Sequence, residues 1–481
     1  MSLGWKFHFT QLAAKAPKFY ASNLPDVNHP DWPAVGKLIG MPWFGRAWII
    51  QEIVVSRAAN LHCGSASLSW NDFYIAFLFG LSTGFFFLRS DVIHDFLAYQ
   101  HLSQLIITYH CFTDGEATAL DFATLLENHR TVGATDPRDK AYALLGLSEL
   151  VEDRKHGIIP DYNLQVTELF EKVAKTILEK SSTLDLLGVS RIVSRQPVGI
   201  LPSWVPDWGV WDFANSLCFR NVQGQYVFAF DAATTSSIPK HLVVKEHTLE
   251  LSGHTFDRIC KVGRPVDPFP ETEDFDQFRI RLSPLVRFLI LILNDWSLVA
   301  RNLSGRKYPT GERITDAFVK TIFLGDVPDL YPMDSERGFL EEHITRVVEA
   351  IGATLQGPRL QQLLDWWYSR ALRRQMVMDS AGIGIALSAI SKASTRVFQV
   401  LPNLIGRNIH RKMFRTTQGY IGLAPRLTEE GVYVVLVKGG RVPLVLRPRG
   451  GQWELIGDCY LHGIMHGKGF EESKCQDIKI V

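Results

Sequence analysis

The stretch that decides the fold is GVYVVLVKGGRVPLVLRPRGGQWELIGDCYLHGIM, residues 431–465. Runs of β-branched and aromatic residues alternate in it with turns that contain Gly or Pro. This pattern predicts a series of short β-strands, and it extends over residues 414–470. A second β-rich stretch, residues 212–262, contains the partly alternating sequence TLELSGHTFDRICKV. The sequence therefore predicts a β-rich body that is built from two separated segments.

Helical periodicity dominates the rest of the chain. Residues 70–130, the segment Val166–Lys180 and residues 281–380 repeat apolar side chains at spacings typical of helices. Ser69 is suited to cap a helix that begins at Trp70. The order is helical, β, helical and β again, without the regular alternation of a doubly wound sheet. We therefore expect an α+β fold.

Composition and charge exclude several classes of protein. Of 481 residues, 46% are hydrophobic and 21% are charged, which is typical of a globular chain and not of a disordered one. The net charge of +1 argues against a uniformly basic protein, so we expect no nucleic acid partner. The six cysteines form no CxxC pair and lack zinc-ligand spacing, so we expect buried reduced thiols and no metal or other cofactor.

Membrane contact and export are also not expected. The most apolar runs, Phe73–Leu88 and Leu285–Ala300, are shorter than the ~20 residues that a spanning helix needs, or are interrupted by Gly, Asn or Asp. Both are better interpreted as buried helices. The N-terminal sequence has no long apolar region typical of a signal peptide, so we expect the cytoplasm.

The sharpest candidate for catalysis is Glu52, which follows Arg46, Trp48 and Gln51 in a predicted helix. Trp48 and Glu52 are neighbours on one helical face. A carboxylate beside an aromatic ring in a cleft is suited to contact a nucleotide ribose or to act as a base. The alternative, which we favour, is that Glu52 pairs with Arg46 or Arg57 and that Trp48 packs inside.

A dense group of charges begins another predicted helix, at Asp136, Arg138, Asp139 and Lys140. One interpretation is a contact with a partner or a phosphate. Because capping and acidic residues in a first turn are common, we favour an ion network that fixes this loop to the core.

The segment LPSWVPDWGVW contains Trp204, Pro206, Asp207 and Trp208 and is too rich in Pro and Trp to be regular. Such residues form either an aromatic binding surface or a rigid linker whose indoles anchor it to a neighbouring domain. Because Trp is mostly buried in proteins, we expect the anchor.

His462 and His466 are four residues apart, a spacing that binds metal on a helix. No third ligand lies nearby in the sequence, and Gly463 and Gly467 argue against a stable helix. We therefore predict a turn at this position.

Three sets of motifs, in this order, resemble the fungal heterokaryon-incompatibility (HET) family. The first is GRAWIIQEIVVSRAANLHCGSASLSW, residues 45–70. The second is TDPRDKAYALLGLSE followed by IIPDYNLQVTELFEKVAKTIL and LPSWVPDW. The third is FRTTQGYIGLAPRLTEEGVYVVLVKGGRVPLVLRP followed by WELIGDCYLHGIMHG, and TGERITDAF also matches. The matching motif residues outside the C-terminal block are Arg46, Trp48, Gln51, Cys63, Gly64, Trp70, Asp136, Arg138, Asp139, Lys140, Trp204, Pro206, Asp207 and Trp208.

The resemblance covers roughly residues 40–470 and also shows a departure. Members of the family begin with blocks around Leu-Ser-Tyr-x-Trp-Gly and Trp-Ile-Asp-x-x-Cys-Ile-Asn-Gln, which build an N-terminal fold likened to TIR domains, and neither block occurs here. The resemblance thus implies a truncated, TIR-like remnant before the α+β body. We expect four parts: residues 1–75, the truncated C-terminal part of a HET domain; residues 76–200, helical; residues 201–262 plus 414–470, the β-rich body; and residues 263–413, a helical insertion and connector.

The function implied by the resemblance is fungal self/non-self recognition, which is linked to programmed cell death. We expect this chain to act through contacts with a protein partner and without catalysis of its own. One alternative is a TIR-like NAD hydrolase that uses Glu52 as its catalytic residue. Another alternative is a non-functional remnant of a truncated gene.

Overall fold

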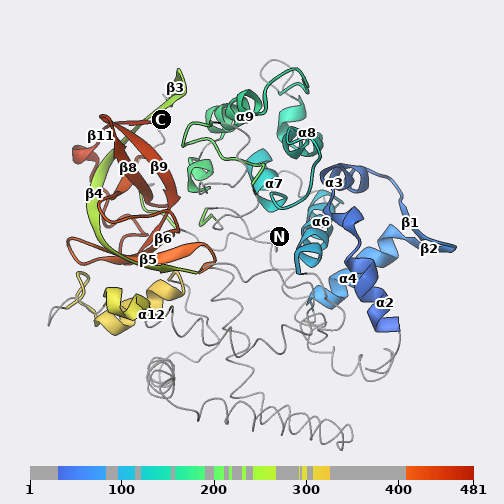
Figure 1. Cartoon of the computed structure of the whole chain (residues 1–481), viewed down its shortest axis with the longest axis horizontal. Helices are drawn as coiled ribbons and strands as arrows, with labels where there is room; N and C mark the ends of the chain where they lie inside the picture. The colour runs from blue at the N-terminus through green and yellow to red at the C-terminus, as the bar shows by residue number, and fades with distance from the viewer. Residues whose placement is uncertain are drawn as a thin grey trace, which may run out of the picture.

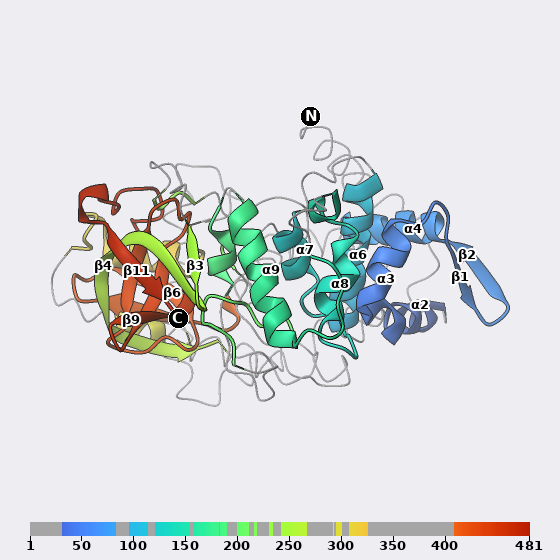
Figure 2. The same ribbon diagram turned by 90° about the horizontal axis from the view of Figure 1, so that it is seen from above.

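The computed structural model contains a helical part and a β-rich part side by side. Figures 1 and 2 both show the strands of the large, mainly C-terminal sheet gathered at one end and the first helices, with a small two-stranded hairpin, at the other. The structure describes residues 31–82, 96–113, 121–152, 158–181, 183–189, 200–210, 216–218, 230–233, 242–266, 292, 295–300, 307–325 and 408–481.

The helical part has two groups of elements around one hydrophobic core. The first group includes a small projecting hairpin and comprises α2 (Asp31–Ile39), η1 (Pro42–Gly45), α3 (Ala47–Val54), β1 (Asn60–Cys63), β2 (Ala66–Ser69) and α4 (Trp70–Ser82). The second group leads toward the β-rich part and comprises α6 (Phe96–Thr113), α7 (Phe122–Asn128), α8 (Asp139–Leu145), η3 (Glu149–Glu152), α9 (Val166–Lys180) and η4 (Asp185–Gly188). Figure 2 shows α7 and α9 between the first group and the strands.

Local sequence signals explain where several helices begin. The Asp72 amide donates a hydrogen bond of 3.1 Å to Ser69 Oγ, which confirms Ser69 as the cap of α4. α9 has the predicted bounds, and the Gln165 amide donates to Glu168 Oε2 at 3.0 Å, as in a capping box. The helix of the charged motif begins at Asp139 and not at the first charge of the motif, because Asp136 accepts the Arg138 amide in a turn.

The β-rich part is one nine-stranded sheet in the described residues. It comprises β3 (Val243–Lys245), β4 (Thr248–Pro265), β5 (Arg411–Thr416), β6 (Ile421–Pro425), β7 (Tyr433–Val437), β8 (Leu444–Arg449), β9 (Gln452–Asp458), β10 (Tyr460–Leu461) and β11 (Gln476–Ile480). The long β4 pairs with β11 and β7 along its first half and with β5 along its second half. Because β11, β9, β8 and β7 also pair in succession, the sheet closes on itself through β4.

The two predicted β-rich segments therefore meet in one sheet, and the α+β class is confirmed. The helix α12 (Ile314–Ile322) packs beside β6. Most of the expected helical insertion, residues 263–413, lies outside the described residues, and the expected part boundaries stay a prediction. No helix in the described part of the chain has the length and apolarity needed to cross a bilayer. The described residues of Phe73–Leu88 and Leu285–Ala300 lie in helices, and their other residues lie outside the description.

All six cysteines are free thiols, as expected, but only three are buried. Cys63 and Cys260 are exposed and Cys475 is half-buried, which corrects the expectation that all six are buried. Cys63 lies on the projecting hairpin, and Cys260 lies on a β4 position that alternates outward. The sequence around the cysteines does not indicate which of them lie on exposed faces of their strands.

A fully buried ion pair connects two strands of the sheet. Arg411 Nη2 on β5 lies 2.6 Å from Asp458 Oδ1 at the end of β9, and both side chains are 0% exposed. The other carboxylate oxygen, Asp458 Oδ2, accepts the Leu217 amide at 2.6 Å and Ser216 Oγ at 3.3 Å. Asp458 therefore joins the sheet to a segment that lies between it and the helices.

Removing one partner of this pair is predicted to be costly. The substitution Arg411→Met leaves the Asp458 charge buried and uncompensated, so the free energy of unfolding should fall by about 3–5 kcal/mol. Denaturant unfolding followed by tryptophan fluorescence measures this value. The control Arg447→Met removes partly exposed pairs with Glu454 and Glu429 and should cost about 1 kcal/mol or less. Equal, small losses in both variants would contradict the assigned role of the buried pair.

Candidate functional site

Glu52 lies on α3 and its side chain is exposed. No ion pair joins it to Arg46 or Arg57 among the residues that the structure describes, so the expected pairing is wrong. Both arginines are themselves exposed, where solvent screens such attractions. Trp48 is half-buried and packs against the hydrophobic core, as expected. Glu52 thus faces solvent, and it is not among the residues that line the pocket described below.

The other residues of the first motif point to different places. Gln51 packs over Gly146 at the end of α8, where an added Cβ would lie 2.6 Å from its side-chain nitrogen. Trp70 is buried in the core at 2% exposure. Cys63 and Gly64 lie on the β1–β2 hairpin, which projects from the helical part (Figures 1 and 2). The motif therefore does not converge on one cleft.

The charged motif at α8 binds the Pro160-Asp161-Tyr162 segment. Arg138 pairs with Asp136 at 2.7 Å, donates to the carbonyls of Leu164, at 2.9 Å, and of Tyr162, and stacks over the Tyr162 ring. Asp139 Oδ1 accepts the Tyr162 hydroxyl at 2.7 Å. The hydrogen bond from Arg138 holds the pKa of Asp136 below its usual range. These contacts form the kind of ion network that fixes a loop.

Lys140 turns inward from the same motif. Its Nζ donates to the carbonyls of Arg130, at 2.9 Å, and of Val132. Burial, together with the nearby Arg130 charge, lowers the pKa of Lys140 to about 8. The loop that it holds bonds in turn to the first motif, because the Ala47 amide donates to the Gly133 carbonyl at 2.9 Å. Lys140 thus links the two motifs.

The segment with Trp204 and Trp208 is an anchor in the structure, since both indoles are 1% exposed. Trp204 Nε1 donates to the His247 carbonyl at 2.8 Å, in the turn between β3 and β4. Trp208 packs edge-on against Phe170 of α9, with ring centroids 5.2 Å apart. Pro206 is buried between them, and the half-buried Asp207 accepts Arg130 through its carbonyl at 3.0 Å. The segment therefore joins α9, the loop after α7 and the sheet.

A further cluster, which we did not predict, joins the TGERITDAF motif to the CYLHG motif. His462 Nε2 lies 2.8 Å from Glu312 Oε1, and His462 Nδ1 lies 2.9 Å from the Tyr460 hydroxyl. Lys320 of α12 pairs with the other Glu312 oxygen at 2.7 Å. Both His462 and His466 lie in a turn, as predicted, and no group of three metal-ligating side chains occurs in the described residues. Glu312 and His462 are 150 residues apart in the sequence, so no local sequence pattern indicates that they form a pair.

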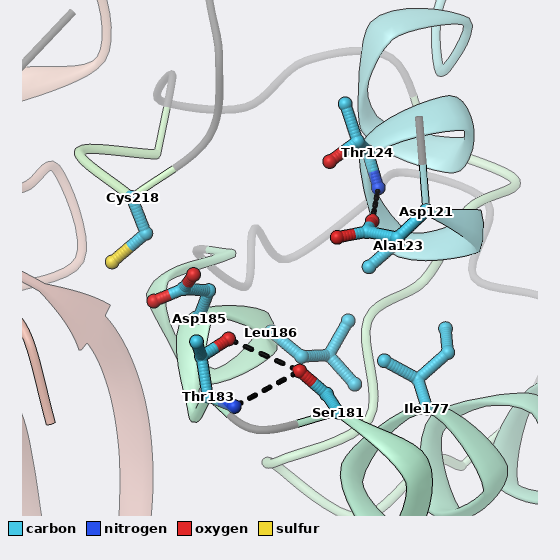
Figure 3. A pocket seen from close by; sticks show the side chains of 9 residues that line it. All are labelled: Asp121, Ala123, Thr124, Ile177, Ser181, Thr183, Asp185, Leu186 and Cys218. Atoms are coloured by element: carbon cyan, nitrogen blue, oxygen red, sulfur yellow. Dashed lines mark hydrogen bonds between the residues drawn. The ribbon is translucent and has the colours of Figure 1, made fainter. Parts of the chain in front are cut away.

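A small pocket lies at the junction of the helices with the sheet. Its lining residues come from α7, α9, η4 and the segment 216–218, and are Asp121, Ala123, Thr124, Ile177, Ser181, Thr183, Asp185, Leu186 and Cys218 (Figure 3). Asp121 caps α7 by accepting the Thr124 amide at 2.6 Å. Asp185 accepts Arg441 Nε, from the loop before β8, at 2.9 Å. Both carboxylates of the pocket are therefore engaged in holding the fold.

The pocket also lacks an activated nucleophile among its described residues. Burial and the neighbouring Asp458 charge raise the pKa of the Cys218 thiol well above its ordinary value. A thiol of this kind stays protonated and unreactive at neutral pH. Cys218 is therefore a buried, protonated thiol at the edge of this pocket.

The Glu312 cluster makes an acid-dependent contribution to stability. Burial raises the pKa of Glu312, but bonds from Lys320, Thr310 and His462 outweigh it and lower the value to about 2. The stabilisation is therefore present above the ordinary glutamate value and is lost as the pH falls toward 2. The difference in unfolding free energy between the native chain and Glu312→Gln should shrink from pH 5 to pH 2, measured by denaturant unfolding at each pH. A difference that does not change with pH would contradict the assignment.

Comparison with known proteins agrees with the geometry of the C-terminal part. Residues 388–481 match the model of the Het-6 β-barrel domain, which covers strands β5 to β11. The chain is 25% identical over 389 residues to heterokaryon incompatibility protein 6, OR allele, of Neurospora crassa. That alignment covers 73% of this chain and 52% of the relative, so the chain spans about half the length of the relative. No solved structure matches the chain. Together, the domain match and the relative support a fungal protein of the heterokaryon-incompatibility type.

Proposed function

We propose that this chain serves fungal self/non-self recognition through contacts with a protein partner, without catalysis of its own. The observation that carries the proposal is that the shared motifs bind one another. The charged motif at α8 holds the Tyr162 segment, and the Glu312 motif holds His462. Residues used in this way form a scaffold, and the outer surface is left for a partner.

The placement of Glu52 supports the proposal that the chain has no catalytic activity of its own. A general base works in a cleft where it reaches the substrate and where burial adjusts its pKa. Glu52 is exposed on α3, and its motif neighbours Gln51 and Trp70 point to other places. A recognition role needs no such cleft, because a partner binds a surface.

The anchor segment explains how one scaffold presents both parts to a partner. Trp204 bonds to the turn of the β3–β4 hairpin, and Trp208 packs on α9. The helices and the sheet are therefore held in a fixed arrangement. A partner that contacts both parts would lose affinity when this arrangement is loosened.

The test is expression of the tagged chain in a fungal host. We expect growth arrest together with specific co-purification of a partner protein. Both should be unchanged in Glu52→Gln and reduced in Trp204→Ala, because only the second change loosens the scaffold. If the chain caused no growth arrest and retained no partner while it unfolds cooperatively on heating, the proposal would be wrong.

A separate assay addresses the catalytic alternative. Purified chain incubated with NAD should release no more nicotinamide than Glu52→Gln does, as measured by chromatography. Release by the native chain that disappears in Glu52→Gln would favour a TIR-like hydrolase and overturn the proposal of a non-catalytic role.

A further inference from the structure

The junction between the helices and the sheet contains a second buried carboxylate, Glu127 of α7. Its side chain is 8% exposed. Arg130 Nη1 lies 3.6 Å from Glu127 Oε2, beyond hydrogen-bond distance. Neither oxygen of Glu127 accepts a hydrogen bond from the described residues. Such a group is costly to bury in its charged form.

Asp458, on the sheet side of the same junction, is the contrasting case. Asp458 is completely buried, and it accepts hydrogen bonds from Arg411 Nη2, the Leu217 amide and Ser216 Oγ. Its charge is therefore compensated by donors with good geometry. Among the described residues, only Arg130 and the Ser216 backbone favour the charged form of Glu127, and neither reaches hydrogen-bond geometry, so its charge is less well compensated than that of Asp458.

Both carboxylates act on the segment 216–218, which lies between α7 and the sheet. The Ser216 backbone favours the charged form of Glu127, and Asp458 disfavours it through repulsion. The remaining charged and titratable groups near Glu127 and Asp458 are of both signs and include one further carboxylate, that of Asp207. Arg130 faces Glu127, with Asp207 and Lys140 beside it, Arg411 faces Asp458, and the thiols of Cys218 and Cys459 are protonated.

We propose that Glu127 is a proton-responsive latch: its protonated form keeps the helices and the sheet closed on the segment 216–218, and its ionisation loosens that junction. A neutral carboxyl removes the repulsion with Asp458 and no longer needs hydrogen-bond donors, which the described residues around Glu127 do not supply. An ionised carboxylate restores both costs, and opening the junction relieves them because water then reaches the group.

The direction of the pH effect follows from burial. Burial, reinforced by the Asp458 charge, raises the pKa of Glu127 above the ordinary glutamate value, although Arg130 opposes this shift. A group whose folded pKa is raised stabilises the closed state only while it is protonated. The junction should therefore loosen as the pH rises through that pKa.

The cysteines provide the readout. Cys218 lies in the junction and is buried, whereas Cys63 and Cys260 are exposed and report the intrinsic reactivity of a thiol at each pH. Buried Cys111 of α6 reports unfolding of the helical part. The full chain is labelled with a thiol reagent between about pH 5 and pH 8, and labelling at each cysteine is quantified by mass spectrometry.

We expect the Cys218 to Cys63 labelling ratio to rise with pH, by at most about tenfold per pH unit because one proton is released, while the Cys111 to Cys63 ratio stays constant. In Glu127→Gln the Cys218 ratio should be independent of pH. The matched control Glu179→Gln removes an exposed charge on α9 and should follow the native chain.

A Cys218 ratio that is constant with pH in the native chain would overturn the latch, as would an equal rise in Glu127→Gln. If Glu127→Gln fails to fold, Cys111 is labelled as fast as Cys63 in that variant. The test then uses the pH dependence of the Cys218 to Cys63 ratio in the native chain and in Glu179→Gln. The result is independent of growth arrest and partner binding, so a failed latch leaves the proposed function standing.

Discussion

The buried pair of Arg411 and Asp458 is the interaction on which the rest of the arrangement depends. Asp458 ends β9, Arg411 begins β5, and the two strands are not neighbours in the sheet. The carboxylate also receives the Leu217 amide, so one side chain connects the sheet to the segment that faces the helices. A buried charge is stable only when its partners are well placed. The contacts of Asp458 therefore fix how the sheet meets the helical part.

The same principle recurs at the other motifs of the chain. Arg138, Lys140 and Glu312 are charged or buried polar groups that bind segments distant in sequence. Each replaces contacts with water by bonds to two or more defined partners. The motifs that resemble those of heterokaryon-incompatibility proteins thus act, among the described residues, as contacts between segments.

Strong local signals in the sequence were sufficient to predict several elements. α9 was predicted with its observed bounds because its apolar face and its start signal agree. The strands after residue 414 follow from short β-branched runs between glycines and prolines. The turn at His462 follows from its flanking glycines. The burial of Trp204 and Trp208 follows from their size.

Partners across long sequence distances could not be predicted in this way. Glu52 was expected to pair with a nearby arginine, but exposure to water makes that pairing weak. Glu312 and His462 were each visible in the sequence, yet only the packing of α12 beside the sheet brings them together. Glu127 carries no local signal at all, since its position at the junction depends on three separate segments.

Calorimetric unfolding of the full chain, combined with hydrogen exchange, tests most directly whether the helices and the sheet form one unit. The account predicts a single cooperative transition, with the slowest amides of α9 and of β7 exchanging at the same free energy. Two transitions, or exchange in one part at a much lower free energy than in the other, would contradict it.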